Sequence, residues 1–347
     1  MKRILVYVIA LLLIQVYSAG AAPGVSTISG AFFEGSSVSI AGSNFGTKSV
    51  AAPVKWDNFN DGTNANRLNT SKWPIQTTQG GSTYPTYSNS VLRTGDVMSV
   101  KTVMGGSQYN CSFGYNGTGN RYWYISYWRY DIAGAAVNFK HFRIYGNSGE
   151  LPQASYTELS SEASLYGIWD EPSADEQCCE WGGVGIRNAW TREEFYLDAG
   201  TRGNSDGSAK YWRNASLLKS FSFNYPALNS GYSGELANPR IGHFWNTDAG
   251  NITSYFSEVY IDNTQARVEI GNNSTWASCT HREIQISTAW SDSSISISVN
   301  KGSFVEGDTV YLFVVDANGN ANSQGYPVTI QKAVAPPSAP KGLRIVQ

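Results

Sequence analysis

Charged residues, cysteines and long apolar runs are scarce in this sequence, and each of these features argues against a class of protein. Only 15% of the 347 residues are charged, and the formal net charge is −2. Lysines and arginines are scattered, so the basic surface that nucleic acid requires is not predicted. No stretch approaches the roughly 20 apolar residues of a transmembrane helix, so we expect a chain that does not span a membrane. The cysteine spacing does not resemble a zinc site.

The N-terminus has the order of segments found in a secretory signal. Lys2 and Arg3 precede an apolar run from Ile4 to Val16, and small residues follow. Signal cleavage occurs after a small residue, which predicts a cut after Ala21. We therefore expect residues 1–21 to be a signal peptide. The mature protein is expected to be secreted, either extracellular or on the outer cell surface.

The cysteines are four in number, and an even number in an exported chain favours disulfides over reactive thiols. The predicted disulfide residues are Cys111, Cys178, Cys179 and Cys279. Spacing alone does not give their pairing. A vicinal bridge, two separate links, and one link plus unpaired thiols all remain open.

The abundant residues are those of a sheet protein with many turns. The chain has 35 glycines, 21 tyrosines and 11 tryptophans. Strong helix formers do not recur at helical spacing over any long window, so the prediction is an all-β protein. Its length is sufficient for two domains that each bury a core.

Two segments far apart in the sequence resemble parts of one immunoglobulin-like domain. The run from Val38 to Gly46 resembles the second-strand signature of the IPT/TIG family, in which an alternating strand precedes Gly-x-x-Phe-Gly. The remaining strands resume at 266–271, 294–299 and 309–315. We predict a split IPT/TIG-like domain made of residues 24–54 and 265–332. The alternative is a short N-terminal arm beside a separate C-terminal sandwich.

The segment between those halves, residues 55–264, alternates short strands with turns at the spacing of a sandwich. Two strands around the Asp206-Gly207 turn resemble the central hairpin of concanavalin A-like jelly rolls, and 256–263 is similar to their closing strand. The predicted fold is a concanavalin A-like jelly roll inserted in, or flanked by, an immunoglobulin-like β-sandwich. Residues 333–347 form a Pro-rich tail, of which 337–345 resemble the start of a fibronectin type III module.

Strand alternation predicts which side chains of the jelly roll face away from its core. Phe142 and Ile144 suit the core, as do Phe195 and Leu197, so their sequence neighbours point to the opposite face. Aromatic rings there would stack on sugars and arginines would pair with acidic groups. The predicted ligand-binding residues are Trp128, Tyr130, His141, Arg143, Tyr145, Arg187, Glu194 and Tyr196. We expect them to share one groove, and the predicted partner is a polysaccharide or cell-surface glycan.

Catalysis is predicted only weakly by the sequence. The Glu-x-Asp-x-x-Glu pattern of jelly-roll glucanases does not occur. The stretch Phe195–Gly200 resembles the Tyr-Phe-Lys-Ala-Gly run of alginate lyases, although Asp198 stands where that family has Lys and its Gln-x-His motif is missing. Lyases of this fold use a Tyr or His to move a proton and a basic group to neutralise a carboxylate. The catalytic candidates are His141, Arg143 and Tyr196.

Calcium is the cofactor to consider, because loops of this fold often bind it through oxygens. The candidate ligands are Asp57, Asp61 and Asp262, although turn formation explains the same residues. No other cofactor is expected.

Three functions follow from these features. The first is a carbohydrate-binding or adhesion protein without catalysis. The second is an extracellular polysaccharide lyase or hydrolase of jelly-roll fold. The third is a self-assembling subunit of a sheath, filament or surface layer, because long edge strands pair readily.

Overall fold

The computed structural model of this chain describes residues 21–108, 110–133, 139–147, 153–158, 162–169, 177–182, 186–223, 235–244 and 251–333. These residues form β-strands and one short 3-10 helix, η1 (Trp276–Ser278). Within them, no helix has the length and apolar character needed to cross a membrane. The predicted signal peptide, except for its last residue, and all of the predicted tail after residue 333 lie outside the described residues.

The immunoglobulin-like domain combines strands from both ends of the chain. Its strand order is β1-β2-β20-β19-β18-β21-β22, and β2 pairs antiparallel with β20. Alternating apolar residues of these strands, such as Ile40 and Ile295, fill one core. The strands are β1 (Gly24–Ser29), β2 (Ser37–Ser43), β18 (Arg267–Gly271), β19 (Arg282–Trp290), β20 (Ser294–Ser298), β21 (Thr309–Val315) and β22 (Tyr326–Thr329).

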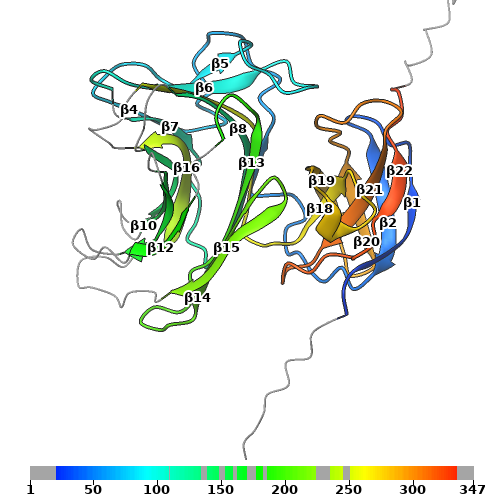
Figure 1. Cartoon of the computed structure of the whole chain (residues 1–347). Coiled ribbons are helices and arrows are strands. Elements are labelled where there is room, and N and C mark those ends of the chain that lie inside the picture. The colour runs from blue at the N-terminus through cyan, green and yellow to red at the C-terminus, as the bar shows by residue number, and fades with distance from the viewer. Residues whose placement is uncertain are drawn as a thin grey trace, which may run out of the picture.

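The jelly roll lies between β2 and β18 in the sequence and consists of two antiparallel sheets. The first, which we name the interface sheet, has the order β15-β14-β13-β8-β17-β6-β5, with β3 also paired to β17. It contacts the immunoglobulin-like domain (Figure 1). Its strands are β3 (Lys55–Asp57), β5 (Thr86–Ser88), β6 (Ser99–Met104), β8 (Tyr122–Ala133), β13 (Thr191–Asp198), β14 (Gly207–Arg213), β15 (Ser216–Phe223) and β17 (Ile252–Asp262).

The second sheet, which we name the outer sheet, lies on the far side of the interface sheet from the immunoglobulin-like domain (Figure 1). Its strand order is β12-β11-β10-β9-β16-β7-β4. Its strands are β4 (Ile75–Gln79), β7 (Asn110–Gly114), β9 (Phe139–Gly146), β10 (Gln153–Glu158), β11 (Glu162–Trp169), β12 (Gln177–Gly182) and β16 (Leu236–Phe244).

An aromatic core fills the space between the two sheets of the jelly roll. Phe142 of the outer sheet and Phe195 of the interface sheet lie with ring centroids 4.2 Å apart, and both belong to the core cluster. Trp73 and Phe113 pack edge to face at 5.0 Å. Such ring contacts bury large apolar areas, which is the main source of stability for a sandwich of short strands. Each sheet therefore presents one further face, away from this core.

Candidate functional site

The outward face of the outer sheet carries two of the sequence-predicted residues, Arg143 and Tyr145 of β9. Phe142 and Ile144 lie in the core, so strand alternation places Arg143 and Tyr145 on the other side of the sheet. Arg143 lies directly opposite Arg240 of β16 in the antiparallel register. Two guanidinium groups therefore come from neighbouring strands onto one face.

Tyr145 lies between these two arginines. Arg143 Nη1 donates a hydrogen bond to the Tyr145 hydroxyl oxygen at 3.2 Å, and the Arg240 guanidinium carbon lies 4.2 Å from the Tyr145 ring centroid. Phe244 completes the group, with its ring centroid 6.4 Å from that of Tyr145. We call Arg143, Tyr145 and Arg240 the Arg–Tyr–Arg cluster. Tyr145 is only 5% exposed, so its ring is held in one orientation.

The position of Arg240 depends on a glycine of the neighbouring strand. Gly114 of β7 lies opposite Arg240, and a Cβ atom built on Gly114 would meet the Arg240 side chain at 2.6 Å. A side chain at this position would therefore displace Arg240 from Tyr145. On the neighbouring strands β4 and β7, the hydroxyls of Thr77 and Ser112 hydrogen-bond each other. Both hydroxyls also lie within hydrogen-bonding distance of Asn110 Oδ1, at 3.0 and 3.1 Å. Polar groups thus continue from the cluster across β7 and β4.

Sequence reasoning found Arg143 and Tyr145 but missed Arg240 and Phe244. A β-bulge between Ile241 and Phe244 interrupts the alternation of β16, so no regular pattern marked these side chains. Only the position of Arg240, next to the apolar Ile241, could have suggested that it faces away from the core. His141, the third predicted residue of β9, has its side chain outside the described residues.

The immunoglobulin-like domain covers the middle of the outward face of the interface sheet, and Trp128 and Glu194 are buried there. Their exposed fractions are 7% and 1%. Alternation correctly placed the Glu194 side chain away from the jelly-roll core. The expectation of one groove shared with Arg143 is wrong, because the two sets lie on different sheets and a second domain covers this one.

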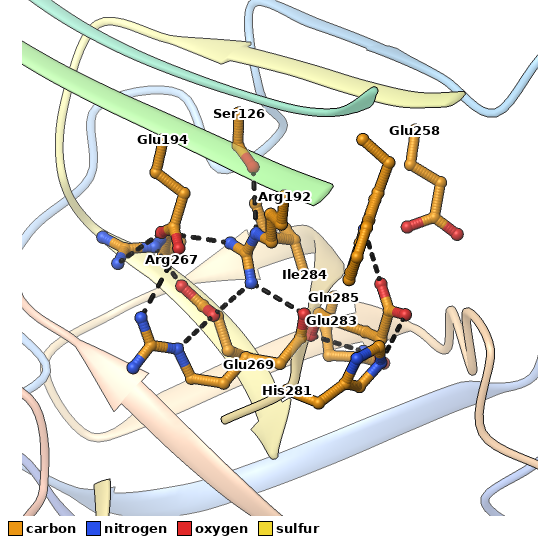
Figure 2. Close-up of polar contacts among 12 residues, drawn as sticks. Ser126, Arg192, Glu194, Glu258, Arg267, Glu269, His281, Glu283, Ile284 and Gln285 are labelled. Carbon is orange, nitrogen blue, oxygen red and sulfur yellow. Dashed lines mark hydrogen bonds and ion pairs between the residues drawn. The ribbon is translucent and has the colours of Figure 1, made fainter. Parts of the chain in front are cut away.

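Glu194 belongs to a buried network of charges between the domains (Figure 2). Arg192 Nη1 lies 2.8 Å from Glu269 of β18, and Arg192 Nη2 lies 3.3 Å from Glu194. Burial alone would raise the pKa of Glu269, but Arg192, Arg267 and Arg282 outweigh it and hold that pKa well below its usual range. The network is satisfied internally and holds the two domains together.

A second buried group surrounds Glu283 of β19, a residue that sequence reasoning missed. Trp128 Nε1 donates to Glu283 at 3.2 Å, His281 Nε2 lies 2.8 Å from it, and Arg93 pairs with it. Arg93 also lies 3.1 Å from Glu258, whose pKa is raised well above its usual range by burial. Glu258 and Glu283 are 5% and 0% exposed, so this group serves the domain contact and leaves little access for a substrate.

Tyr196 lies at the open edge of the same domain contact, on a different sheet from Arg143. Burial and the nearby Asp198 raise the pKa of Tyr196 to about 12. The predicted catalytic set of His141, Arg143 and Tyr196 is therefore corrected: Tyr196 does not face Arg143. Tyr196 instead lines a cleft of about 480 Å³ between the domains.

The two remaining predicted ligand residues, Tyr130 and Arg187, lie apart from the Arg–Tyr–Arg cluster. Tyr130 contacts Trp190 and Tyr255, with ring centroids at 5.7 and 6.4 Å, in a row across the interface sheet. Arg187 Nη1 lies 3.3 Å from Asp131. Among the described residues, neither Tyr130 nor Arg187 contacts Arg143.

The candidate calcium ligands are paired with lysines. Lys72 Nζ lies 3.8 Å from Asp57 and 2.6 Å from Asp61, and Lys48 Nζ lies 2.6 Å from Asp262. An ammonium group therefore stands beside each of these carboxylates. In the described part of the chain, no three His, Cys, Asp or Glu side chains are arranged to hold a metal.

Cys111 and Cys279 are free, buried thiols, which corrects the expectation that both form disulfides. Cys111 lies in β7 of the jelly roll and Cys279 follows η1 of the immunoglobulin-like domain, so the two are buried in separate domains. Burial raises the pKa of Cys111 to about 11. Cys178 and Cys179 belong to β12, and their side chains lie outside the described residues.

Comparison with known proteins gives likenesses of fold at low identity. No protein-family model matches the sequence, and no curated protein resembles it closely enough to be called a relative. An endo-β-1,4-glucuronan lyase from the fungus Trichoderma reesei is 11% identical, with a TM-score of 0.46 over 61% of this chain and 96% of that one. The cellulose-induced protein Cip1 is 15% identical, with a TM-score of 0.43 over 60% and 97% of the two chains. A variant of alginate lyase Aly36B in complex with an alginate trisaccharide is 9% identical, with a TM-score of 0.45 over 62% and 99%. At these identities and scores, the comparisons do not assign an activity to this chain.

Proposed function

We propose that this protein is an extracellular polysaccharide lyase that acts on a uronate-containing polymer at the outward face of the outer sheet. The observation that carries the proposal is the Arg–Tyr–Arg cluster. Its two guanidinium groups come from adjacent strands, and a tyrosine hydroxyl lies 3.2 Å from one of them. The proposal includes secretion and assigns the immunoglobulin-like domain to the IPT/TIG class.

The arginines suit the carboxylates of such a polymer. A guanidinium group binds a carboxylate through two parallel hydrogen bonds, and it keeps its charge at any physiological pH. Adjacent antiparallel strands lie about 5 Å apart, which is close to the length of one sugar unit. Arg143 and Arg240 would therefore contact the same uronate or neighbouring ones.

The tyrosine supplies a group that exchanges a proton. In β-elimination the Tyr145 oxygen would remove the proton at C5, next to the uronate carboxylate, and the bond from C4 to the glycosidic oxygen would break. A double bond forms between C4 and C5, and the leaving oxygen takes up the proton that Tyr145 removed. The Arg143 guanidinium would stabilise the negative charge that develops on the carboxylate and on the Tyr145 oxygen.

A second candidate is binding of the same polymer without cleavage. The observation that favours it is the low exposure of Tyr145, at 5%, which leaves little of its ring open to a substrate. In that case the arginines hold the polymer and Tyr145 fixes their positions.

The test uses a panel of polyuronates. Ultraviolet absorbance measures the unsaturated product ends, and affinity electrophoresis measures polymer binding. For a lyase we expect Tyr145→Phe to lower the rate about 100-fold or more while binding persists, because only the proton-transferring hydroxyl is lost. Arg240→Ala is expected to weaken both.

Arg67→Ala is the matched control, since the Arg67 guanidinium also lies over a tyrosine ring, that of Tyr84, at 3.6 Å, away from the cluster. Binding without product on every polymer would select the second candidate. If neither binding nor product is detected with any polymer, the outward face is rejected as a uronate site.

A further inference from the structure

The cleft between the two domains is a second candidate binding site, separate from the Arg–Tyr–Arg cluster. Its volume is about 480 Å³, within the range of small-ligand pockets. It lies on the interface sheet, on the opposite side of the jelly roll from the outward face of the outer sheet. The residues that line it are Tyr122, Tyr196, Asp198, Ser208, Lys210, Asn263, Thr264, Gln265, Ala317 and Asn318.

The jelly roll provides one wall of this cleft through cross-strand neighbours. Tyr122 of β8 lies opposite Asp198 of β13, which lies opposite Ser208 of β14. In the next row, Tyr196 lies opposite Lys210. Tyr122 is 40% exposed, so its ring offers a surface on which a sugar could stack.

The immunoglobulin-like domain and the connection leading to it provide the other wall, and this wall is fixed by short contacts. Asp316 Oδ1 accepts hydrogen bonds from the backbone nitrogens of Asn318 and Asn320, at 2.9 and 2.8 Å. Gly319 has a φ of +85°, and a Cβ built there would lie 2.6 Å from the Gln265 side chain. The turn that presents Asn318 is therefore packed against the connection at Gln265.

Polar groups in the cleft retain capacity for a ligand. Within the described part of the chain, the side chains of Ser208, Lys210, Asn263 and Asn318 have no hydrogen bond or ion pair. They offer a hydroxyl, an ammonium and two amides, which together supply both donors and acceptors. Sugar hydroxyls need this mixture.

The local charge favours an anionic group on the ligand. Asp198 is already paired, because Arg121 Nε and Nη2 lie 2.5 and 3.1 Å from its two carboxylate oxygens. The Lys210 ammonium is therefore the charge that remains for a ligand. Burial raises the pKa of Tyr196 to about 12, so this phenol stays protonated and acts as a hydrogen-bonding group, without a role in proton transfer.

We infer that this cleft binds a short oligosaccharide that carries a carboxylate or sulfate group, with the anion against Lys210 and a sugar ring against Tyr122. Because the two walls belong to different domains, the split arrangement of the chain itself builds the site. The inference does not depend on cleavage at the outer sheet.

The test is calorimetric titration of the protein containing both domains with trisaccharides, in a Tyr145→Phe background that prevents cleavage. The probes are a glucuronate trisaccharide, a sulfated trisaccharide and the neutral glucose trisaccharide. We expect Tyr122→Ala and Lys210→Met each to weaken binding of at least one charged probe fivefold or more. Lys101→Met is the matched control, because Lys101 lies on the interface sheet but outside the cleft.

Arg240→Ala separates this site from the outer-sheet site. If the inference holds, trisaccharide binding persists in Arg240→Ala even where polymer binding is lost. Equal affinity for the neutral and charged probes would overturn the role of Lys210. The site would be overturned if none of the three probes gave a heat of binding. It would also be overturned if Arg240→Ala abolished trisaccharide binding while Tyr122→Ala had no effect. Unchanged melting temperatures would show that these variants fold.

Discussion

His243 makes the stability of the jelly roll depend on pH. It lies opposite Cys111 in the register of β16 and β7, on the core side, and it is 0% exposed. Burial, with smaller contributions from Arg129 and Arg187, lowers the pKa of His243 from 6.5 to about 3. The folded protein therefore keeps this imidazole neutral. The unfolded chain takes up a proton below its own pKa of 6.5, so stability is fully present above that pH and falls as the pH drops toward 3.

The expected loss follows from the width of this window. Each pH unit below 6.5 costs about 1.4 kcal/mol, so the folded state loses about 3 kcal/mol between about pH 7 and about pH 4.5. Urea unfolding followed by tryptophan fluorescence at both pH values measures it. His243→Met replaces the imidazole with an apolar side chain of similar size. All other titrating groups contribute equally to the pH dependence of the wild type and of this variant. The wild type should therefore lose about 3 kcal/mol more than the variant on acidification. Equal losses in the two proteins would refute the reasoning.

Two further predictions concern buried groups. Arg192→Leu should lower the free energy of unfolding by about 3–5 kcal/mol in the same urea assay, because it leaves Glu194 and Glu269 buried with fewer partners. Lys72→Ala, which removes two ion pairs, with Asp57 and Asp61, made by a side chain that is 36% exposed, should cost less than about 1 kcal/mol, and equal costs would contradict the structural role of the network. Iodoacetamide at about pH 8 should alkylate the Cys111 thiol only after unfolding, since burial raises its pKa to about 11. Peptide mass mapping of the native protein would show label at Cys111 if this is wrong.

The sequence predicts the direction of many side chains because alternation is a local property of a strand. It placed Phe142 in the core and Arg143 on the opposite face, and it likewise placed Glu194 away from the core. It could not show that a second domain covers Glu194. That covering depends on residues such as Glu269, which lies 75 positions later in the chain.

The residues that sequence reasoning missed lie where the local pattern is interrupted. Arg240 precedes a bulge at which Gly242 has a φ of +127°, so its neighbours do not alternate regularly. Glu258 lies at another such interruption, with a φ of +48°. Both positions acquire their contacts from segments that are distant in sequence. The pairing of β9 with β16 brings Arg240 beside Arg143, and the loop between β5 and β6 brings Arg93 beside Glu258.

The domain arrangement limits which faces of the jelly roll are open to a polymer. Two chain connections join the domains, one before β3 and one after β17, and buried ion pairs between Arg192 and Glu269 reinforce them. Separating the domains would also expose the apolar contact of Tyr124 and Tyr260 with Ile284, which costs free energy. A polysaccharide therefore gains more by binding where no domain has to move. The outward face of the outer sheet meets that condition for a long chain, and the cleft beside Tyr122 meets it for a short one.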